Sequence, residues 1–142
     1  MGYVYDHQVR FHETDGAGVV YFTNELVICH AAYEASLEAA GLDVGQFFRA
    51  EGVAHPIVHA SIDYRRPLRC GDRLVVHLTP IRLDESSFEI EYQLKLNDGL
   101  AAQALTRHVC IEVASRRRAT LSTQIEQWLE RWGVPSAQME ES

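Results

Sequence analysis

Hydrophobic residues between positions 21 and 40 recur at intervals of three and four, which predicts a long helix. One apolar face of this helix is formed by Leu26, Cys29, Tyr33, Leu37 and Ala40. A second apolar face is formed by Ile28, Ala31, Ala32, Ala35 and Ala39. Only a narrow polar stripe of His30, Glu34 and Glu38 separates them, so we expect a largely enclosed helix that ends before Gly41.

Most of the remaining chain is β-prone or alternates apolar with polar residues at a period of two, which predicts strands. The predicted strands cover residues 3–11, 58–64, 88–96 and 100–114, and a further strand begins with Leu74, Val76 and Leu78. The alternation is clearest in 88–96, where one face of the strand must be in water. Asn97-Asp98-Gly99 then predicts a hairpin.

A short helix closes the pattern. Thr123 and Glu126 have the spacing of a capping box, and the helix stops at Gly133. Its apolar stripe consists of Ile125, Trp128, Leu129 and Trp132. The glycine-containing segment 41–52 is expected to be a connection without regular structure.

Together these elements predict an α+β fold, in which a curved antiparallel sheet of about five strands wraps a long central helix. The wet face of strand 88–96 indicates that the sheet covers the helix on one side only. The second apolar face of the helix would then pack on another subunit, in a homodimer or homotetramer. We predict one domain over residues 1–135 and a flexible tail over 136–142.

Composition narrows the class of protein. The 142 residues include 13 Lys and Arg against 20 Asp and Glu, and the formal charge of -7 argues against binding nucleic acid or anionic membranes. No apolar run approaches the ~20 residues of a membrane helix, and the N-terminus lacks the features of a signal peptide, so we expect a cytoplasmic protein. Three cysteines without a C-x-x-C pair predict no disulfide framework and no zinc ribbon.

The most suggestive chemistry lies in Asp15-Gly16-Ala17-Gly18, immediately before the long helix. A helix N-terminus offers unpaired backbone N–H groups and a positive dipole end, which can hold a developing oxyanion, and Asp15 would stand beside it. The alternative is structural: Asp15 caps a turn and the glycines satisfy its dihedral angles. Spacing alone favours this alternative.

Other kinds of site are less well supported. Gly16-x-Gly18 lacks the third glycine of a dinucleotide site. His55 and His59 would lie roughly 13 Å apart on one strand, too far to share a metal ion. Cys29 and His30 diverge by about 100° on a helix, which disfavours a Cys-His nucleophile. We therefore predict no metal site.

Arginines are concentrated in two places, and the planar guanidinium group suits phosphate. The two clusters are Arg65, Arg66, Arg69 and Arg73, and Arg116, Arg117 and Arg118. Either cluster could hold a polyphosphorylated ligand. The alternative, a solvated turn and a solvated strand end, is equally compatible with the sequence.

Several segments together resemble the hotdog-fold acyl-CoA thioesterases of the 4-hydroxybenzoyl-CoA type. The resemblance runs from about residue 3 to residue 130, and its most specific part is the stretch from Glu13 to Phe22. Pro67 and Gly71-Asp72 before a strand add to it. Tyr21-Phe22-Thr23-Asn24, Ile28-Cys29-His30, Tyr33 to Leu37 and His108 to Ile111 are most similar to the branch that hydrolyses 1,4-dihydroxy-2-naphthoyl-CoA in phylloquinone synthesis.

The resemblance implies a site without a cofactor that acts on an acyl-CoA. Asp15 matches the catalytic carboxylate, as nucleophile or general base, the backbone N–H of Phe22 matches the oxyanion donor, and Gly18 matches the turn glycine. Where many relatives carry a carboxylate on the helix, this chain has His30, which we expect to bind a ring hydroxyl of the acyl group. His59 is a weaker candidate for the same pocket.

We expect Arg65 and Arg66 to help bind the CoA moiety. Two other functions remain open at this point: a thioesterase with a broader range of aryl or short-chain acyl groups, and a non-catalytic hotdog module that binds acyl-CoA or an acyl carrier. A hotdog dehydratase is less well supported, because no His and acid pair stands out.

Overall fold

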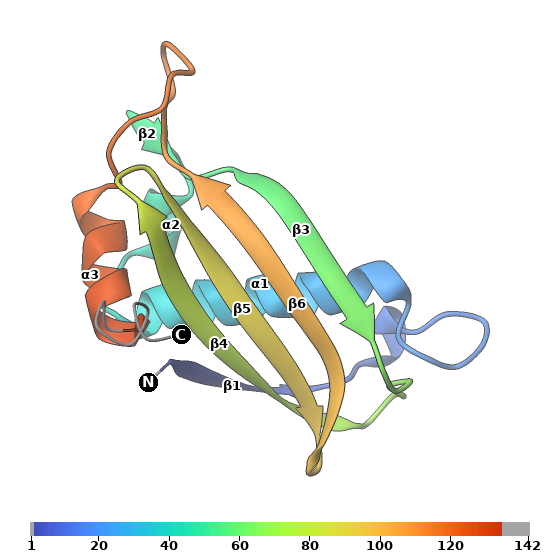
Figure 1. Ribbon diagram of the computed structural model, residues 1–142. Helices are drawn as coiled ribbons and strands as arrows, with labels where there is room; N and C mark the ends of the chain where they lie inside the picture. Colours follow the sequence, from blue (N-terminus) through green and yellow to red (C-terminus); the bar gives the residue numbers. More distant parts are fainter. Residues whose placement is uncertain (1, 135–142) are drawn as a thin grey trace.

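The structure is a computed structural model that describes residues 2–134 (Figure 1). A five-stranded antiparallel sheet curves across one side of the long helix α1 (Phe22–Ala39). The strands, in spatial order, are β1 (Tyr3–Gln8), β4 (Arg73–Asp84), β5 (Ser87–Leu96), β6 (Gly99–Val109) and β3 (Ile57–Tyr64). The predicted α+β fold is confirmed. The predicted tail 136–142 lies outside the described residues.

Short elements complete the fold. They are the 3-10 turn η1 (Phe11–Glu13), α2 (Val44–Phe47), the two-stranded ladder of β2 (Val53–Ala54) and β7 (Ile111–Glu112), and α3 (Thr123–Trp132). α3 packs against β4 and α1. Its N-cap is Ser122, whose hydroxyl accepts the N–H of Ile125, so the predicted capping box at Thr123 was one residue late.

α1 packs on the sheet with residues from both predicted apolar faces. Ile28, Cys29, Ala32, Tyr33 and Leu37 are all in the core. Because the helix has 3.6 residues per turn, the pair Ile28 and Cys29 and the pair Ala32 and Tyr33 each lie side by side beneath the sheet. The prediction of a separate second apolar face was therefore wrong for Ile28 and Ala32. The outer side of α1 carries the exposed Val27 and half-buried His30, Ala31 and Glu34.

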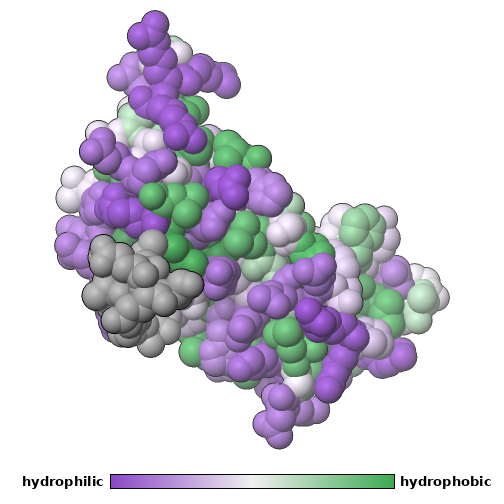
Figure 2. Space-filling model, viewed as in Figure 1, coloured by the Kyte–Doolittle hydropathy of each residue, from purple (hydrophilic) through white to green (hydrophobic). Residues whose placement is uncertain are grey.

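β5 follows the predicted alternation: Phe88, Ile90, Tyr92 and Leu94 are buried, while Glu91 and Gln93 are exposed. Figure 2 shows hydrophilic and hydrophobic residues mixed over the face of the molecule seen in Figure 1. In contrast, β3 is an edge strand that pairs only with β6. Because β3 pairs on one side only, its other backbone edge is open. Its Ile57, Val58 and Tyr64 are exposed.

Two strands and one connection differ from the prediction. β1 ends at Gln8, because the Glu13 carboxylate accepts the N–H of Arg10 and closes η1. Segment 41–52 contains α2, which begins because the Asp43 carboxylate accepts the N–H of Gln46. The predicted strand 100–114 is interrupted at Cys110, between β6 and β7.

A buried histidine makes the fold sensitive to acid. His108 is 1% exposed, stacks on Phe88 with ring centroids 4.7 Å apart, and shares a 2.9 Å hydrogen bond with the Thr106 hydroxyl. Burial lowers the pKa of His108 to about 4, whereas an unfolded histidine has its ordinary pKa near 6.5. The unfolded chain therefore binds a proton that the folded chain excludes, so this contribution to stability is lost as pH falls below about 6.5.

We expect the stability advantage of the wild-type protein over His108→Gln to shrink by about 2 kcal/mol between pH 7.5 and pH 5.0. Urea unfolding of both proteins at each pH measures this difference. The comparison with the variant is needed because burial raises the pKa of Glu25 to about 7, and Glu25 therefore stabilises the fold as pH falls. A difference that does not change with pH would contradict the assignment of a neutral, buried His108.

Candidate active site

Residues 14–20 form a tight loop between η1 and α1. Thr14 and Val20 form an antiparallel bridge, and the N–H of Asp15 donates to the carbonyl of Val19 at 2.9 Å. Gly18 donates to the carbonyl of Asp15 at 3.0 Å and has a φ of +80°, a left-handed conformation that favours glycine. The loop therefore fixes where Asp15 emerges.

The Asp15 carboxylate is exposed at the start of this loop. Its Oδ1 accepts the N–H of Ala17 at 2.9 Å. Within residues 2–134, Oδ2 has no hydrogen-bond partner. Asp15 thus does cap its turn, as the structural alternative predicted, and one carboxylate oxygen remains available for chemistry.

The N-terminus of α1 is held in place beside this loop, with no side chain capping it. The N–H of Tyr21, the N-cap residue, donates to the carbonyl of Glu13 at 2.9 Å, and Asn24 Nδ2 donates to the same carbonyl at 2.9 Å. The Tyr64 hydroxyl donates to the carbonyl of Phe22 at 2.6 Å. The N–H of Phe22 is the first of the helix and has no intrahelical acceptor, so it is free to donate.

Glu13 supports both the loop 14–20 and the N-terminus of α1, a role that was not identified from the sequence. It is buried, and both its carboxylate oxygens lie 3.0 Å from His7 Nε2. Its carbonyl accepts the two hydrogen bonds from the beginning of α1 described above. Glu13 therefore ties β1 to the helix start, a role that depends on backbone positions and leaves little signal in the sequence.

A pocket of about 310 Å³ opens next to the helix start. It lies among the loop before α1, the first turn of α1, and the segment that follows β3. Its lining consists of Val19, Val20, Phe22, Glu25, Tyr64, Arg65, Arg66, Pro67 and Leu68. The pocket is therefore mostly apolar, with one carboxyl group and two arginines.

Comparison with known proteins agrees with this geometry. The sequence profile of the Thioesterase-like superfamily matches residues 9–129. The chain belongs to this superfamily. A 1,4-dihydroxy-2-naphthoyl-CoA hydrolase of Nostoc punctiforme is 48% identical over 130 residues, which cover 92% of this chain and 88% of that protein. One from Rippkaea orientalis is 51% identical over 128 residues, covering 88% and 93%.

A solved structure agrees as well. The crystal structure of a 1,4-dihydroxy-2-naphthoyl-CoA thioesterase from Synechocystis matches with a TM-score of 0.86 and 38% identity, covering 91% of this chain and 96% of that one. The acyl-CoA thioesterase class and hotdog fold expected from the sequence are thereby confirmed.

Only part of the predicted site of this thioesterase-like chain comes together within one subunit. Asp15, Gly18 and Phe22 lie in one continuous segment, and Arg65 and Arg66 line the same pocket as Phe22. His30 lies eight residues further along α1, about 12 Å along the helix axis from Phe22. It contacts the carboxylate of Glu34 at 3.2 Å and is not among the pocket residues.

His59 lies on the exposed edge strand β3, opposite Arg107 in register, and about 16 Å along the strand from Tyr64. His55 lies outside that strand, stacked on Phe47 with centroids 5.4 Å apart, so the predicted strand carrying both histidines was wrong. Residues 2–134 contain no group of three or more His, Cys, Asp or Glu placed to hold a metal ion.

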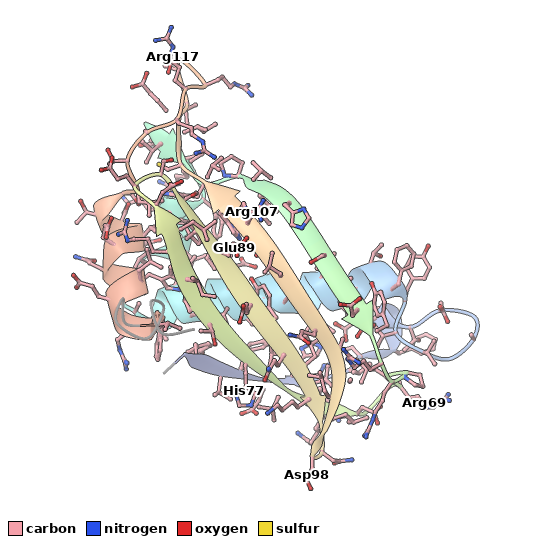
Figure 3. All side chains as sticks on the ribbon, in the orientation of Figure 1. Arg69, His77, Glu89, Asp98, Arg107 and Arg117 are labelled. Atoms are coloured by element: carbon pink, nitrogen blue, oxygen red, sulfur yellow. The ribbon has the colours of Figure 1, made fainter. Side chains whose placement is uncertain are left out.

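The two arginine clusters lie at opposite ends of the molecule. Figure 3 places Arg69 at the end near the helix start and Arg117 at the far tip, beyond β7. Arg66 packs over Gly99, where a Cβ atom would collide with its guanidinium group. Arg118 lies 3.9 Å from the Asp84 carboxylate. Within one chain, only the cluster at 65–73 is near the candidate site.

The Cys-His alternative is disfavoured by burial. Cys29 is in the core, and burial raises the pKa of its thiol to about 12. A thiol that remains protonated at neutral pH is a poor nucleophile. Cys29 is therefore a packing residue beneath the sheet.

Proposed function

We propose that this protein hydrolyses 1,4-dihydroxy-2-naphthoyl-CoA to 1,4-dihydroxy-2-naphthoate and CoA. The observation that carries the proposal is the free carboxylate oxygen of Asp15 in a closed loop immediately before the uncapped N-terminus of α1. The relatives from Nostoc punctiforme and Rippkaea orientalis, both named as hydrolases of this thioester, support the choice of substrate.

In this proposal, the N–H of Phe22 donates to the thioester carbonyl oxygen and stabilises the negative charge that develops there. The dipole of the 18-residue helix α1 adds to this stabilisation. Asp15 either attacks the carbonyl carbon, giving a mixed anhydride that water then cleaves, or takes a proton from an attacking water molecule. The leaving group is a thiolate. The corresponding thiol has a reference pKa near 8.5, so the thiolate leaves with little help from a general acid.

The CoA moiety is polyanionic and must approach a chain whose formal charge is -7. We infer that Arg65 and Arg66, which line the pocket, supply the local positive field for its phosphates.

We further propose that the protein is cytoplasmic. Within residues 2–134, no helix is long and apolar enough to span a membrane.

We further propose that the complete site forms between subunits of a homodimer or homotetramer. The exposed edge of β3 and the outer side of α1, including Val27, offer surfaces for a second copy. His30 lies on that outer side and is not among the residues that line the pocket of its own chain. It would instead meet the acyl group bound to a neighbouring subunit, where its imidazole binds a ring hydroxyl.

His30→Ala tests this role. We expect the variant to lose about 10-fold in kcat/KM on 1,4-dihydroxy-2-naphthoyl-CoA and much less on unsubstituted 2-naphthoyl-CoA, because only the first substrate offers a ring hydroxyl. Thiol release from both substrates measures the ratio. An unchanged ratio of kcat/KM between the two substrates would contradict the assignment of His30 to the acyl pocket.

The proposed activity is tested by release of free CoA thiol from 1,4-dihydroxy-2-naphthoyl-CoA by the purified protein. We expect catalytic turnover without added metal or cofactor. Binding of the thioester without turnover would instead identify the chain as an acyl-CoA-binding module.

A further inference from the structure

Glu25 is a buried carboxyl group that the proposed mechanism does not use. It is the fourth residue of α1 and is only 4% exposed. Its Oε1 is buried and has no hydrogen-bond partner within the part of the chain that the structure describes. A buried polar atom without a partner is destabilising, so its presence needs an explanation.

Glu25 lines the pocket at the helix start. The pocket is otherwise formed largely by apolar side chains, including those of Val19, Val20 and Leu68. Arg65 and Arg66 line it too, but neither forms an ion pair with Glu25 among residues 2–134. A small number of polar groups in a mostly apolar pocket fixes the orientation of a ligand, and Glu25 is the one carboxyl group among them.

The position of Glu25 relates it to the reaction. It follows Phe22 by three residues, so the two residues share one side of the first helical turn. Phe22 provides the N–H that we assign to the thioester carbonyl. An acyl group held there would extend along the pocket with its far polar atoms within reach of Glu25.

Burial also sets the protonation state of Glu25. Because desolvation raises its pKa to about 7, a large fraction of the side chain is a neutral carboxylic acid near neutral pH. A neutral carboxylic acid both donates and accepts hydrogen bonds, and a phenolic hydroxyl does the same. The two groups are therefore complementary.

We propose that Glu25 is a specificity-determining residue that exchanges a hydrogen bond with a hydroxyl group of the bound acyl moiety and so selects hydroxylated aryl thioesters. The inference rests on the proposed function. It explains why a buried carboxyl group lines a mostly apolar pocket although its Oε1 has no hydrogen-bond partner among residues 2–134.

Two variants at this position test the inference. In Glu25→Leu the polar group is lost, and we expect kcat/KM on 1,4-dihydroxy-2-naphthoyl-CoA to fall about 10-fold or more, with less than a threefold change on 2-naphthoyl-CoA. Glu25→Gln keeps a donor and an acceptor, so it should retain about a third or more of wild-type kcat/KM on both. Glu130→Leu, the same change at an exposed position on α3, is the control and should behave as wild type.

Thermal unfolding and molecular mass complete the test. Because Glu25→Leu removes an unpaired buried carboxyl group, we expect its melting temperature at pH 7.5 to rise by about 3–6 °C. Equal losses on both thioesters, or no loss, would overturn the inference. A variant that changes the number of subunits would also overturn it, because Glu25 would then serve an interface.

Binding of the product acids separates this inference from the proposed function. Titration calorimetry with 1,4-dihydroxy-2-naphthoate and 2-naphthoate should show a preference for the hydroxylated acid in the wild type that Glu25→Leu loses. If the wild type hydrolyses neither thioester but shows this pattern, the proposed function fails and the role of Glu25 stands. If it hydrolyses both and Glu25→Leu leaves their ratio unchanged, only the inference fails.

Discussion

Asp15→Asn is expected to lower kcat on 1,4-dihydroxy-2-naphthoyl-CoA by about 1,000-fold or more, because an amide neither attacks a thioester nor accepts a proton from water at neutral pH. The fold should be unaffected. The Asn side-chain oxygen can accept the same 2.9 Å hydrogen bond from Ala17 N–H, and Gly18 keeps its left-handed conformation. Steady-state thiol release, with circular dichroism to check folding, measures the effect.

Asp43→Asn is the matched control for this substitution. Asp43 is also an exposed carboxylate that accepts a backbone N–H, from Gln46 at 3.0 Å, but it begins α2 and lies outside the candidate site. We expect this variant to retain full activity. If Asp15→Asn kept more than a tenth of wild-type kcat, Asp15 would be a turn residue and the assignment would be wrong.

Trp128→Ala is expected to have the largest effect on stability, about 3–5 kcal/mol. Trp128 is fully buried, with ring centroids 5.4 Å from Tyr33 and 5.2 Å from Phe88, so it joins α3 to both α1 and β5. Its indole N–H donates to the Ser36 hydroxyl at 2.8 Å. The substitution leaves a cavity and removes this donor, and urea unfolding at pH 7.5 measures the loss.

Trp132→Ala is the control for Trp128→Ala. Trp132 is only half-buried, although its indole N–H also donates, to the Ser36 carbonyl at 2.9 Å. We expect a loss of about 1–2 kcal/mol, because less apolar surface is uncovered. Equal effects of the two substitutions would contradict the view that Trp128 is the centre of the interface between α3 and the core.

The main elements could be predicted because their signals are local. The periodicity of residues 21–40 and the alternation in 88–96 each depend on one segment facing one core. The exposure of β3 could not be predicted, because it follows from its place at the edge of the sheet, next to β6 alone. α2 was missed because four residues held by the Asp43 cap give no periodic pattern.

The residues of the candidate site also differ in whether the sequence alone could reveal them. Asp15, Gly18 and Phe22 lie in one short segment, which a loop glycine and a helix start marked in the sequence. The roles of these three residues came from the resemblance to the hotdog thioesterases. Glu25 was not identified, because its environment depends on Tyr64 and Leu68, which line the same pocket and lie about 40 residues later in the chain. Which arginines lie near the site likewise depended on the fold.

The central claim is that this site hydrolyses a dihydroxynaphthoyl thioester. It is tested most directly by kcat/KM of the wild-type protein on 1,4-dihydroxy-2-naphthoyl-CoA, benzoyl-CoA and an aliphatic acyl-CoA, measured side by side by thiol release. We predict that the first value exceeds the other two by about 100-fold or more. Comparable values for all three would contradict this account and identify a thioesterase of broad range.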